Sequence, residues 1–351
     1  MDFKSRLLSR FGIIVVIIHI AVGFVIFISI SSGSTLTNDR VLKNAADLIH
    51  SLAKTTYEFN LERVINNLGI AYYFTKSGVK VNENELIEFS VENQLTHKKE
   101  RIKIPKMYIN KALISNDVKM VDKIQKLVGG TVTIFQVFPK GLLRISTSVR
   151  KKSGKRAIGT YIPAKSQVYK TIMQGKTYKG RAFVVTDWYI TAYKPLLDAQ
   201  GKIIGAIYVG VKQTNLNSFK KIIESLKIGK SGYPYIIDRR GEIIFHPEIK
   251  GNILALKDIH GKKYIKKIIK LKNGRLSYYY KSGEDGVNRE KIVYFRFLKE
   301  MKWYIVVSAY SKELFGMVSN LLMIAFIIQA ITITTFFALL ILKRSKQGIK
   351  P

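Results

Sequence analysis

Hydroxyl-bearing, aromatic and cationic side chains recur on the β-rich stretches of this sequence, and residues of these types can recognise a ligand. Tyr189, Thr191 and Tyr193 occupy every second position of one stretch, so a strand would place all three on one face. A small polar ligand needs hydrogen-bond donors held by a rigid sheet and a cation that offsets a carboxylate charge. The first group of candidates is Arg144, Ser146, Arg181, Tyr189, Thr191 and Tyr193. The second group is Tyr233, Tyr235, His246, Lys291 and Tyr294.

Alternatives stay open for these residues. A tyrosine in a strand often serves only as sheet packing with a solvated hydroxyl, and His246 could make a structural hydrogen bond at a strand end. The facing of Arg181 depends on the next turn. If residues 186–187 form a two-residue turn, Val184 opposes Tyr189. Arg181 then lies on the face opposite to these two, whereas a three-residue turn would reverse it.

Sequence motifs for catalysis, metal binding and nucleotide binding are missing. The chain has no cysteine, no G-x-S-x-G sequence, and five histidines too far apart in sequence to hold one metal from a helix or hairpin. Residues 224–231, ESLKIGKS, end like a phosphate-binding loop but begin with Glu where the pattern needs Gly. Asp187, Asp198 and Asp238 occupy expected turns, where an Asx role accounts for them. We therefore expect no catalytic residue, no metal and no cofactor, and no enzyme activity.

Two uncharged apolar stretches, residues 11–30 and 317–342, are each long enough to cross ~30 Å of hydrocarbon as a helix. Basic residues precede the first and follow the second, so the positive-inside rule places both termini in the cytoplasm and residues 31–315 outside it. A cleaved signal peptide is the alternative for the first stretch, but its apolar core is longer than an ordinary h-region. The net charge of +35 is spread over a segment that a membrane separates from the nucleoid, so we expect no nucleic-acid partner.

The external segment begins with a helical pattern. Apolar residues recur at a helical period from residue 38 to 68, which predicts a long stem helix ended by Gly69. The residues that follow suggest a hairpin around Asn82 and Asn84. The basic stretch 96–106 is expected to be a solvated loop.

A repeated order of elements follows. An amphipathic helix over residues 115–128, with Ser115 as its N-cap, precedes two strands, a short helix and three strands. The same order recurs from Asn217 onwards. Short hairpins join most of the strands, so these strands must pair antiparallel, which excludes a doubly wound sheet. The sequence therefore predicts an α+β fold with two tandem lobes, each a mixed antiparallel sheet flanked by helices.

Four stretches of the sequence together resemble the Cache 3/Cache 2 fusion family of extracytoplasmic sensor domains. They are GTVTIFQVFPKGLLRISTSVRKKSGKRAIGTYIP, GKTYKGRAFVVTDWYITAYKPLLDAQGKIIGAIYVGVK, IGKSGYPYIIDRRGEIIFHPEIKG and KWYIVVSAY. The resemblance covers residues 35–312 and implies two PAS-like lobes on a long N-terminal helix, in a bacterial chemotaxis or sensor-kinase receptor. It also implies a pocket on the central strands. The pocket residues are Tyr189, Thr191 and Tyr193 in the first lobe and Tyr233, Tyr235 and Lys291 in the second.

With the two apolar stretches, the leading hypothesis is a homodimeric, double-pass sensor of the bacterial plasma (inner) membrane. It would bind a small anionic or zwitterionic ligand, an organic acid or amino acid, and signal by helix rearrangement. The alternative is an envelope interaction protein whose lobes bind a protein or polymer. The last residues, KRSKQGIKP, look like a HAMP linker cut short, so the chain is truncated or works with a separate cytoplasmic signalling partner. The expected segments are a cytoplasmic N-terminus (1–10), a transmembrane helix (11–30), a stem helix (31–69), a first lobe (70–214), a second lobe (215–312), a second transmembrane helix (317–342) and a cytoplasmic stub (343–351).

Overall fold

The computed structural model of the chain describes residues 38–310, except 214–215, 229–230 and 282–286, together with 327–328, 331–332, 334–335 and 338. Among these residues, no helix is both long and apolar enough to cross a membrane. The first expected span, 11–30, and the expected cytoplasmic ends, 1–10 and 343–351, lie outside the described residues. Most of the second expected span, 317–342, also lies outside them.

The chain divides into two compact units, each built from helices and a sheet. We call Leu52–Phe219 the first lobe, and the described residues up to Ser51 and from Lys220 onwards the second lobe. The helix α2 (Asn38–Thr75) supplies residues to each lobe. Both lobes combine helices with sheets, which confirms the predicted α+β class.

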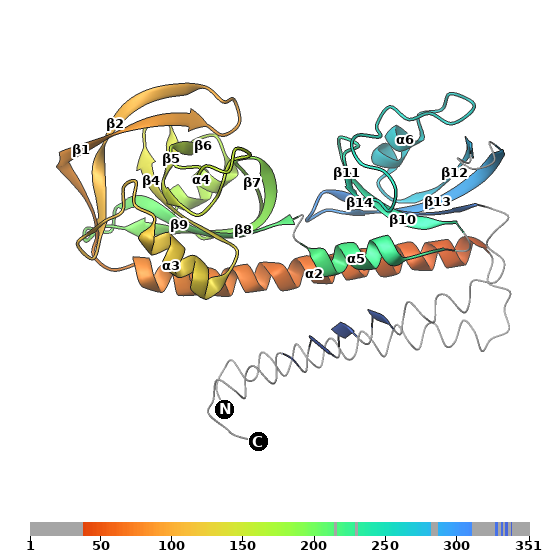
Figure 1. Ribbon diagram of the computed structural model, residues 1–351, viewed down its shortest axis with the longest axis horizontal. Coiled ribbons are helices and arrows are strands. Elements are labelled where there is room, and N and C mark those ends of the chain that lie inside the picture. Colours follow the sequence, from red (N-terminus) through yellow and green to blue (C-terminus); the bar gives the residue numbers. More distant parts are fainter. Residues whose placement is uncertain are drawn as a thin grey trace, which may run out of the picture. The chain divides into compact units, whose positions relative to one another are not determined.

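The stem helix α2 continues past Gly69, its expected end, to Thr75 (Figure 1). A glycine costs a helix interior about 1 kcal/mol relative to alanine. Beyond it, however, Ala71 and Thr75 are fully buried, and the Thr75 hydroxyl donates to the Ala71 carbonyl at 3.0 Å. Burial of this last turn outweighs the cost of the glycine, so the predicted stop was wrong.

A nine-stranded sheet forms the first lobe, in the order β3-β2-β1-β6-β5-β4-β9-β8-β7. Its strands are β1 (Val79–Asn93), β2 (Lys99–Ile109), β3 (Ala112–Leu113), β4 (Thr131–Phe138), β5 (Gly141–Thr147), β6 (Thr160–Pro163), β7 (Tyr178–Val184), β8 (Asp187–Leu197) and β9 (Ile203–Lys212). Neighbouring strands are antiparallel except β1 and β6, which are parallel. The sheet is therefore mixed, as predicted.

The hairpin at the start of this sheet differs from the prediction. β1 and β2 pair along most of their length, and their connection lies at residues 94–98 rather than at Asn82 and Asn84. Those two asparagines lie in an irregularity within β1. The basic stretch 96–106 mostly forms β2 rather than a solvated loop. Its apolar residues alternate with charged ones, and Ile104 is buried, which is the pattern of a half-buried strand.

Two short helices complete the first lobe, α3 (Lys119–Val128) and α4 (Gln167–Met173). α3 buries Val121 and Ile124, as an amphipathic helix should. The prediction that Ser115 caps α3 was wrong. Its hydroxyl instead accepts a hydrogen bond from the Met107 N–H at 2.9 Å, and Val118 stands at the N-cap. The hydroxyl of Ser166 does cap α4.

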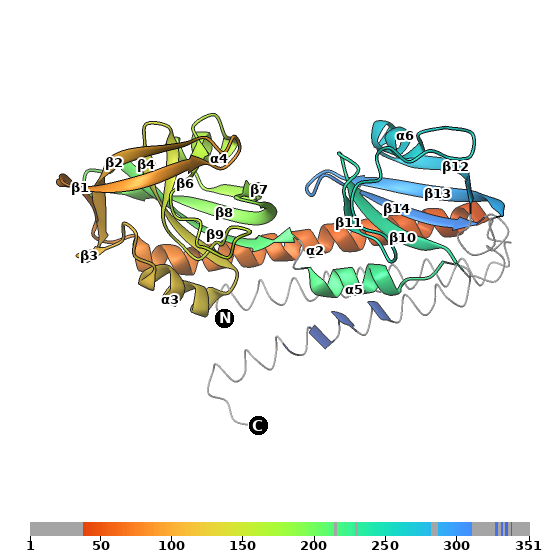
Figure 2. The same cartoon turned by 45° about the horizontal axis from the view of Figure 1, so that its top comes forward.

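Helices cover both faces of the first-lobe sheet (Figures 1 and 2). α4 contributes Val168 and Ile172 to a hydrophobic core on one face, which we call the α4 face. α3 and the first-lobe part of α2 cover the other face. There the Lys194 ammonium lies 3.9 Å from the ring centroid of Tyr72 on α2. The α4 face is the one that carries the candidate site.

The second lobe contains a five-stranded sheet in the order β11-β10-β14-β13-β12. The helix α5 (Asn217–Ser225) begins in the last residues of the first lobe and continues into the second. The other elements of the second lobe are β10 (Tyr233–Asp238), β11 (Ile243–Phe245), α6 (Tyr264–Leu271), β12 (Gly274–Lys281), β13 (Asn288–Leu298) and β14 (Trp303–Tyr310). This strand order repeats that of β5-β4-β9-β8-β7, so the predicted duplication is confirmed. The described strands of this sheet are all antiparallel rather than mixed, because this lobe has no counterpart of the parallel β1–β6 pair.

Candidate ligand-binding site

The strands β8 and β9 place Tyr189, Thr191 and Tyr193 on the α4 face, as their alternation predicted. Tyr193 pairs with Tyr208, and both belong to the core on that face. Tyr189 belongs to the same core, and Thr191 lies between the two tyrosines of β8. The three predicted residues therefore form one set.

The turn before β8 has a different register from the predicted one. Val184 pairs with Asp187, two residues before the predicted partner. A shift of two residues preserves the face of every side chain, so the predicted facing survives the wrong pairing. Arg181 pairs with Ile190 on the opposite face, where its guanidinium lies 3.6 Å from the Trp188 ring centroid. Arg181 is thus separated from the tyrosine set.

Ser146 is also separated from the set, although Arg144 joins it. A bulge shifts the register of β4 and β5, so that Arg144 pairs with Phe135 but Ser146 pairs with Ile134. Phe135 and Ile134 are neighbours on one strand and therefore point to opposite faces. Phe135 belongs to the core of the α4 face. Arg144 therefore points into that core and Ser146 points away from it.

Arg144 is fully buried, at 0% exposure, in the middle of β5. Its Nη1 donates to the Thr160 hydroxyl, and its guanidinium lies 4.9 Å from the Phe135 ring centroid. Its Nε and Nη2, like the Tyr193 hydroxyl, are buried without a hydrogen-bond partner among the described residues. Nε and Nη2 form one edge of the planar guanidinium, and such an edge can hold a carboxylate through two parallel N–H···O bonds.

Burial and three tyrosines set the direction of the pKa shift of Arg144. Burial lowers the pKa of Arg144, and Tyr193, Tyr208 and Tyr189 oppose that shift. Burial raises the pKa of Tyr193, and the Arg144 charge lowers it in part. Burial likewise raises the pKa of Tyr208 and of Tyr189. The phenols are neutral at physiological pH, while an arginine stays protonated, so the site presents a buried cation among neutral hydroxyls.

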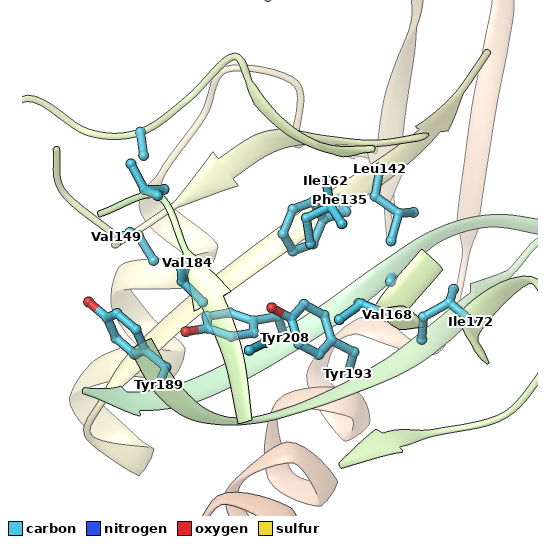
Figure 3. Close-up of a cluster of buried hydrophobic side chains, with 14 residues drawn as sticks. Phe135, Leu142, Val149, Ile162, Val168, Ile172, Val184, Tyr189, Tyr193 and Tyr208 are labelled. Carbon is cyan, nitrogen blue, oxygen red and sulfur yellow. The ribbon is translucent and has the colours of Figure 1, made fainter. Parts of the chain in front are cut away.

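Aromatic rings gather in the core of the α4 face, where Figure 3 shows Phe135, Tyr193 and Tyr208 together, and the Arg144 guanidinium lies against the Phe135 ring. The rings of Tyr193 and Tyr208 lie 4.8 Å apart between centroids, and Phe135 lies 6.0 Å from Tyr193. The Tyr208 hydroxyl is 3.0 Å from Thr131 Oγ1, and the Thr191 hydroxyl donates to a β7 carbonyl at 2.7 Å. The hydroxyls of Tyr208 and Thr191 are therefore already engaged, in contrast to that of Tyr193.

Two site residues were missed by the sequence reasoning. Tyr208 was detectable, because pairing the two stretches directly across the DAQG turn places it opposite Thr191, on the face of the tyrosine set. A register shift near the turn makes Tyr193 its partner in the structure, on the same face. Thr160 lies on the short strand β6, which no sequence pattern indicated. It contacts Arg144 only because β6 pairs with β5.

The second lobe brings together four of its five predicted residues. Lys291 is 3% exposed, and its Nζ donates to the Tyr233 hydroxyl at 3.1 Å. The same ammonium lies 4.2 Å from the Tyr233 ring centroid and 5.3 Å from that of Tyr310. The His246 ring centroid lies 4.9 Å from that of Tyr233 and 5.4 Å from that of Tyr235. A lysine, tyrosines and a histidine thus form one cluster.

His246 makes the structural hydrogen bond that was the alternative to ligand contact. Its Nδ1 accepts the N–H groups of Glu248 and Ile249 at 3.0 and 3.1 Å, which leaves the ring proton on Nε2. Burial, and then the charge of Lys291, lowers the pKa of His246 to about 4. Tyr294 alternates with the core residues of β13 and points to the opposite face. Within the described part of the chain, no cluster of His, Asp and Glu could hold a metal ion.

A family model described as the Cache 3/Cache 2 fusion domain matches residues 30–323, more than half of the chain. The chain belongs to this family. The resemblance inferred from the sequence is thereby confirmed, and the match spans both lobes of this Cache protein. No curated protein matches the sequence.

Several solved structures are similar to this Cache chain. The ligand-binding domain of the Campylobacter jejuni chemoreceptor Tlp3, in complex with 4-methylisoleucine, is 12% identical. The match covers 81% of this chain and 96% of that chain, with a TM-score of 0.44. The periplasmic sensory domain of the C. jejuni chemoreceptor Tlp1 is also 12% identical. That match covers 79% of this chain and 96% of that chain, with a TM-score of 0.40. A Cache chemosensory domain solved to explain carboxylic acid recognition is 20% identical. That match covers 27% of this chain and 69% of that chain, with a TM-score of 0.25.

Proposed function

We propose that this chain is the extracytoplasmic, small-molecule-sensing part of a bacterial transmembrane signal-transduction or chemotaxis receptor. Arg144 carries the proposal, because its buried guanidinium has a partnerless Nε and Nη2 edge on the same sheet face as Tyr193. Moving such an ion out of water costs several kcal/mol, and a counter-charge with hydrogen bonds must offset this cost. Membership of the Cache 3/Cache 2 fusion family supports a sensing role.

A ligand carboxylate supplies both the counter-charge and the hydrogen bonds. Its two oxygens can accept from Nε and Nη2 of Arg144, and the Tyr193 hydroxyl can donate a third bond. The rings of Phe135 and Tyr208 provide apolar walls for the rest of the molecule. The ligand class is therefore a small molecule that carries a carboxylate, an organic acid or an amino acid.

The stem helix α2 is the element that would carry the signal. It packs on the opposite face of the first-lobe sheet, where Tyr72 contacts Lys194 and the Asn67 amide donates to the Val128 carbonyl at 2.7 Å. The same helix supplies residues to the second lobe. A ligand shifts the helix between two arrangements only by its differential affinity for them. The expected signal is such a population shift.

The remaining parts of the proposal concern the setting. We place the protein in the plasma (inner) membrane as a double-pass homodimer, with residues 31–315 outside the cytoplasm. The apolar stretches 11–30 and 317–342 and their flanking basic residues support this topology. The output would come from a following module or a separate cytoplasmic partner.

A thermal-shift series on the full 351-residue chain in detergent tests the proposal. The probes are short organic acids and amino acids at increasing concentration. A ligand at about 100 times its Kd should add about 2.7 kcal/mol of stability, which raises the melting temperature. Arg144→Met should abolish that rise.

Arg181→Met is the matched control, because it removes an arginine from the opposite face of the same sheet. It should leave the ligand-induced rise in place. If no organic acid or amino acid raises the melting temperature, the small-molecule proposal is wrong and a macromolecular partner becomes the better explanation. Equal losses in Arg144→Met and Arg181→Met would contradict the assigned site.

A further inference from the structure

We propose that the first-lobe site selects a carboxylate without an ammonium group, so that its ligand is a simple organic acid rather than an amino acid. This inference rests on the proposed function, because it concerns the same Arg144 site. An amino acid brings a second charge, and a buried ammonium needs a carboxylate or several acceptors close by. No carboxylate of the described residues forms an ion pair with Arg144, whose Nε and Nη2 have no hydrogen-bond partner among them.

Asp187 is the carboxylate that comes nearest to the tyrosine set along the chain. It lies two positions before Tyr189 on β8, so its side chain shares the face of that tyrosine. Its Oδ2, however, is 2.9 Å from Lys212 Nζ and accepts from the Thr186 hydroxyl at 2.7 Å. Asp187 acts on the pKa of Tyr189. One oxygen of this carboxylate is therefore held by a lysine and a hydroxyl, so a ligand ammonium would compete with Lys212 for Asp187.

Other first-lobe carboxylates also lie in ion pairs. These pairs are Asp122–Arg156 at 2.9 Å, Glu92–Lys151 at 2.7 Å and Glu100–Lys140 at 2.5 Å. Each of these acids therefore already has a cation of the protein as its partner. A ligand ammonium in the site would therefore have to be satisfied without an aspartate or glutamate from among them.

The neutral acceptors around Arg144 are mostly engaged as well. The Thr160 hydroxyl accepts from Arg144 and donates to the Ala157 carbonyl at 2.7 Å. The hydroxyls of Thr191 and Tyr208 also have partners. An ammonium beside the guanidinium would add a second cation in a fully buried site, where like charges disfavour each other. The same skeleton without the amine avoids that cost.

Isothermal titration calorimetry on the full chain tests the selectivity with matched pairs. The probes are acetate against glycine, propionate against alanine, butyrate against 2-aminobutyrate and valerate against norvaline. Within each pair the two molecules share a skeleton and a carboxylate and differ by the ammonium. In every pair with a binding member, the simple carboxylate should bind at least about tenfold more tightly, a difference of about 1.4 kcal/mol.

The outcomes separate this inference from the proposed function. An amino acid that binds as tightly as its carboxylate partner, with binding lost in Arg144→Met, overturns the selectivity but keeps the sensing site. If no probe binds at millimolar concentration, the proposed function fails and the inference fails with it.

The variant Asp187→Asn tests directly whether Asp187 receives a ligand ammonium, because it compares amino-acid affinity with carboxylate affinity. Carboxylate affinity should stay within about twofold of the wild type, because Asp187 is held by Lys212. If Asp187→Asn weakens amino-acid binding tenfold or more (about 1.4 kcal/mol) while sparing the carboxylate, Asp187 receives a ligand ammonium and the inference is overturned.

Discussion

Replacing Arg144 by methionine separates a ligand-binding arginine from a structural one. The substitution removes the guanidinium but leaves an unbranched apolar chain in the core. It loses the hydrogen bond to Thr160 and the contact with the Phe135 ring, together about 2–4 kcal/mol. It also removes a buried ion whose Nε and Nη2 have no partner among the described residues, and the burial of such an ion is unfavourable by several kcal/mol. The ligand-free first lobe should therefore gain about 1–4 kcal/mol of stability.

Urea unfolding without ligand measures this change. The chain has two tryptophans, Trp188 in the first lobe and Trp303 in the second, so fluorotryptophan NMR follows the lobes separately. The Trp188 transition should move to higher urea in Arg144→Met, while the Trp303 transition stays in place. In the same variant, ligand affinity should fall by about 30-fold or more, since truncating one partner of a buried charge pair costs about 2–5 kcal/mol.

The opposite stability result would refute the reasoning. If Arg144→Met destabilises the first lobe by about 3–5 kcal/mol, the arginine is one member of a buried ion pair within the protein. Arg181→Met controls for the loss of an arginine as such. It removes a stacking contact with Trp188, worth about 0.5–2 kcal/mol, and should leave ligand affinity unchanged.

Further predictions concern single groups in each lobe. Tyr193→Phe removes a hydroxyl with no partner among the described residues, so stability should hold while calorimetry shows about 5–10-fold weaker ligand binding. Asp47→Asn breaks an ion pair with Arg296, and because Asp47 is 46% exposed, urea unfolding of the second lobe should show a loss of at most about 1 kcal/mol. The pKa of His246, about 4, is below that of an unfolded histidine. The unfolded chain therefore binds this proton first, and the second lobe should lose stability as pH falls from about 6.5 to about 4. His246→Asn should flatten that loss in a pH series of melting temperatures. Lys291→Met should raise the pKa of His246, measured by NMR, because it removes a neighbouring positive charge while the burial that lowers this pKa remains.

Alternation and short turns made the central sheets predictable. The strands around Tyr193 follow a strict period of two, and a mistaken turn register shifted the pairing by two residues, which keeps the faces. Ser146 escaped prediction because a bulge between β4 and β5 changes the face of every residue beyond it. Alternation read across a bulge gives the wrong side, and no residue type in that stretch marks the bulge.

Tertiary contacts decided the elements that the sequence mispredicted. Gly69 has the local signature of a helix stop, but buried Ala71 and Thr75 extend α2 beyond it. Ser115 has the signature of an N-cap, but it hydrogen-bonds the neighbouring strand instead. The short strand that carries Thr160 forms only by pairing with distant strands. Local propensities cannot register such partners.

A crystal structure of the chain with its tightest-binding short carboxylate tests the central claim most directly. The account predicts both carboxylate oxygens on the α4 face, at about 2.7–2.9 Å from Nε and Nη2 of Arg144, with the Tyr193 hydroxyl in contact. A ligand found elsewhere, for example on the Lys291 cluster of the second lobe, with the Arg144 edge still without a partner, would contradict it.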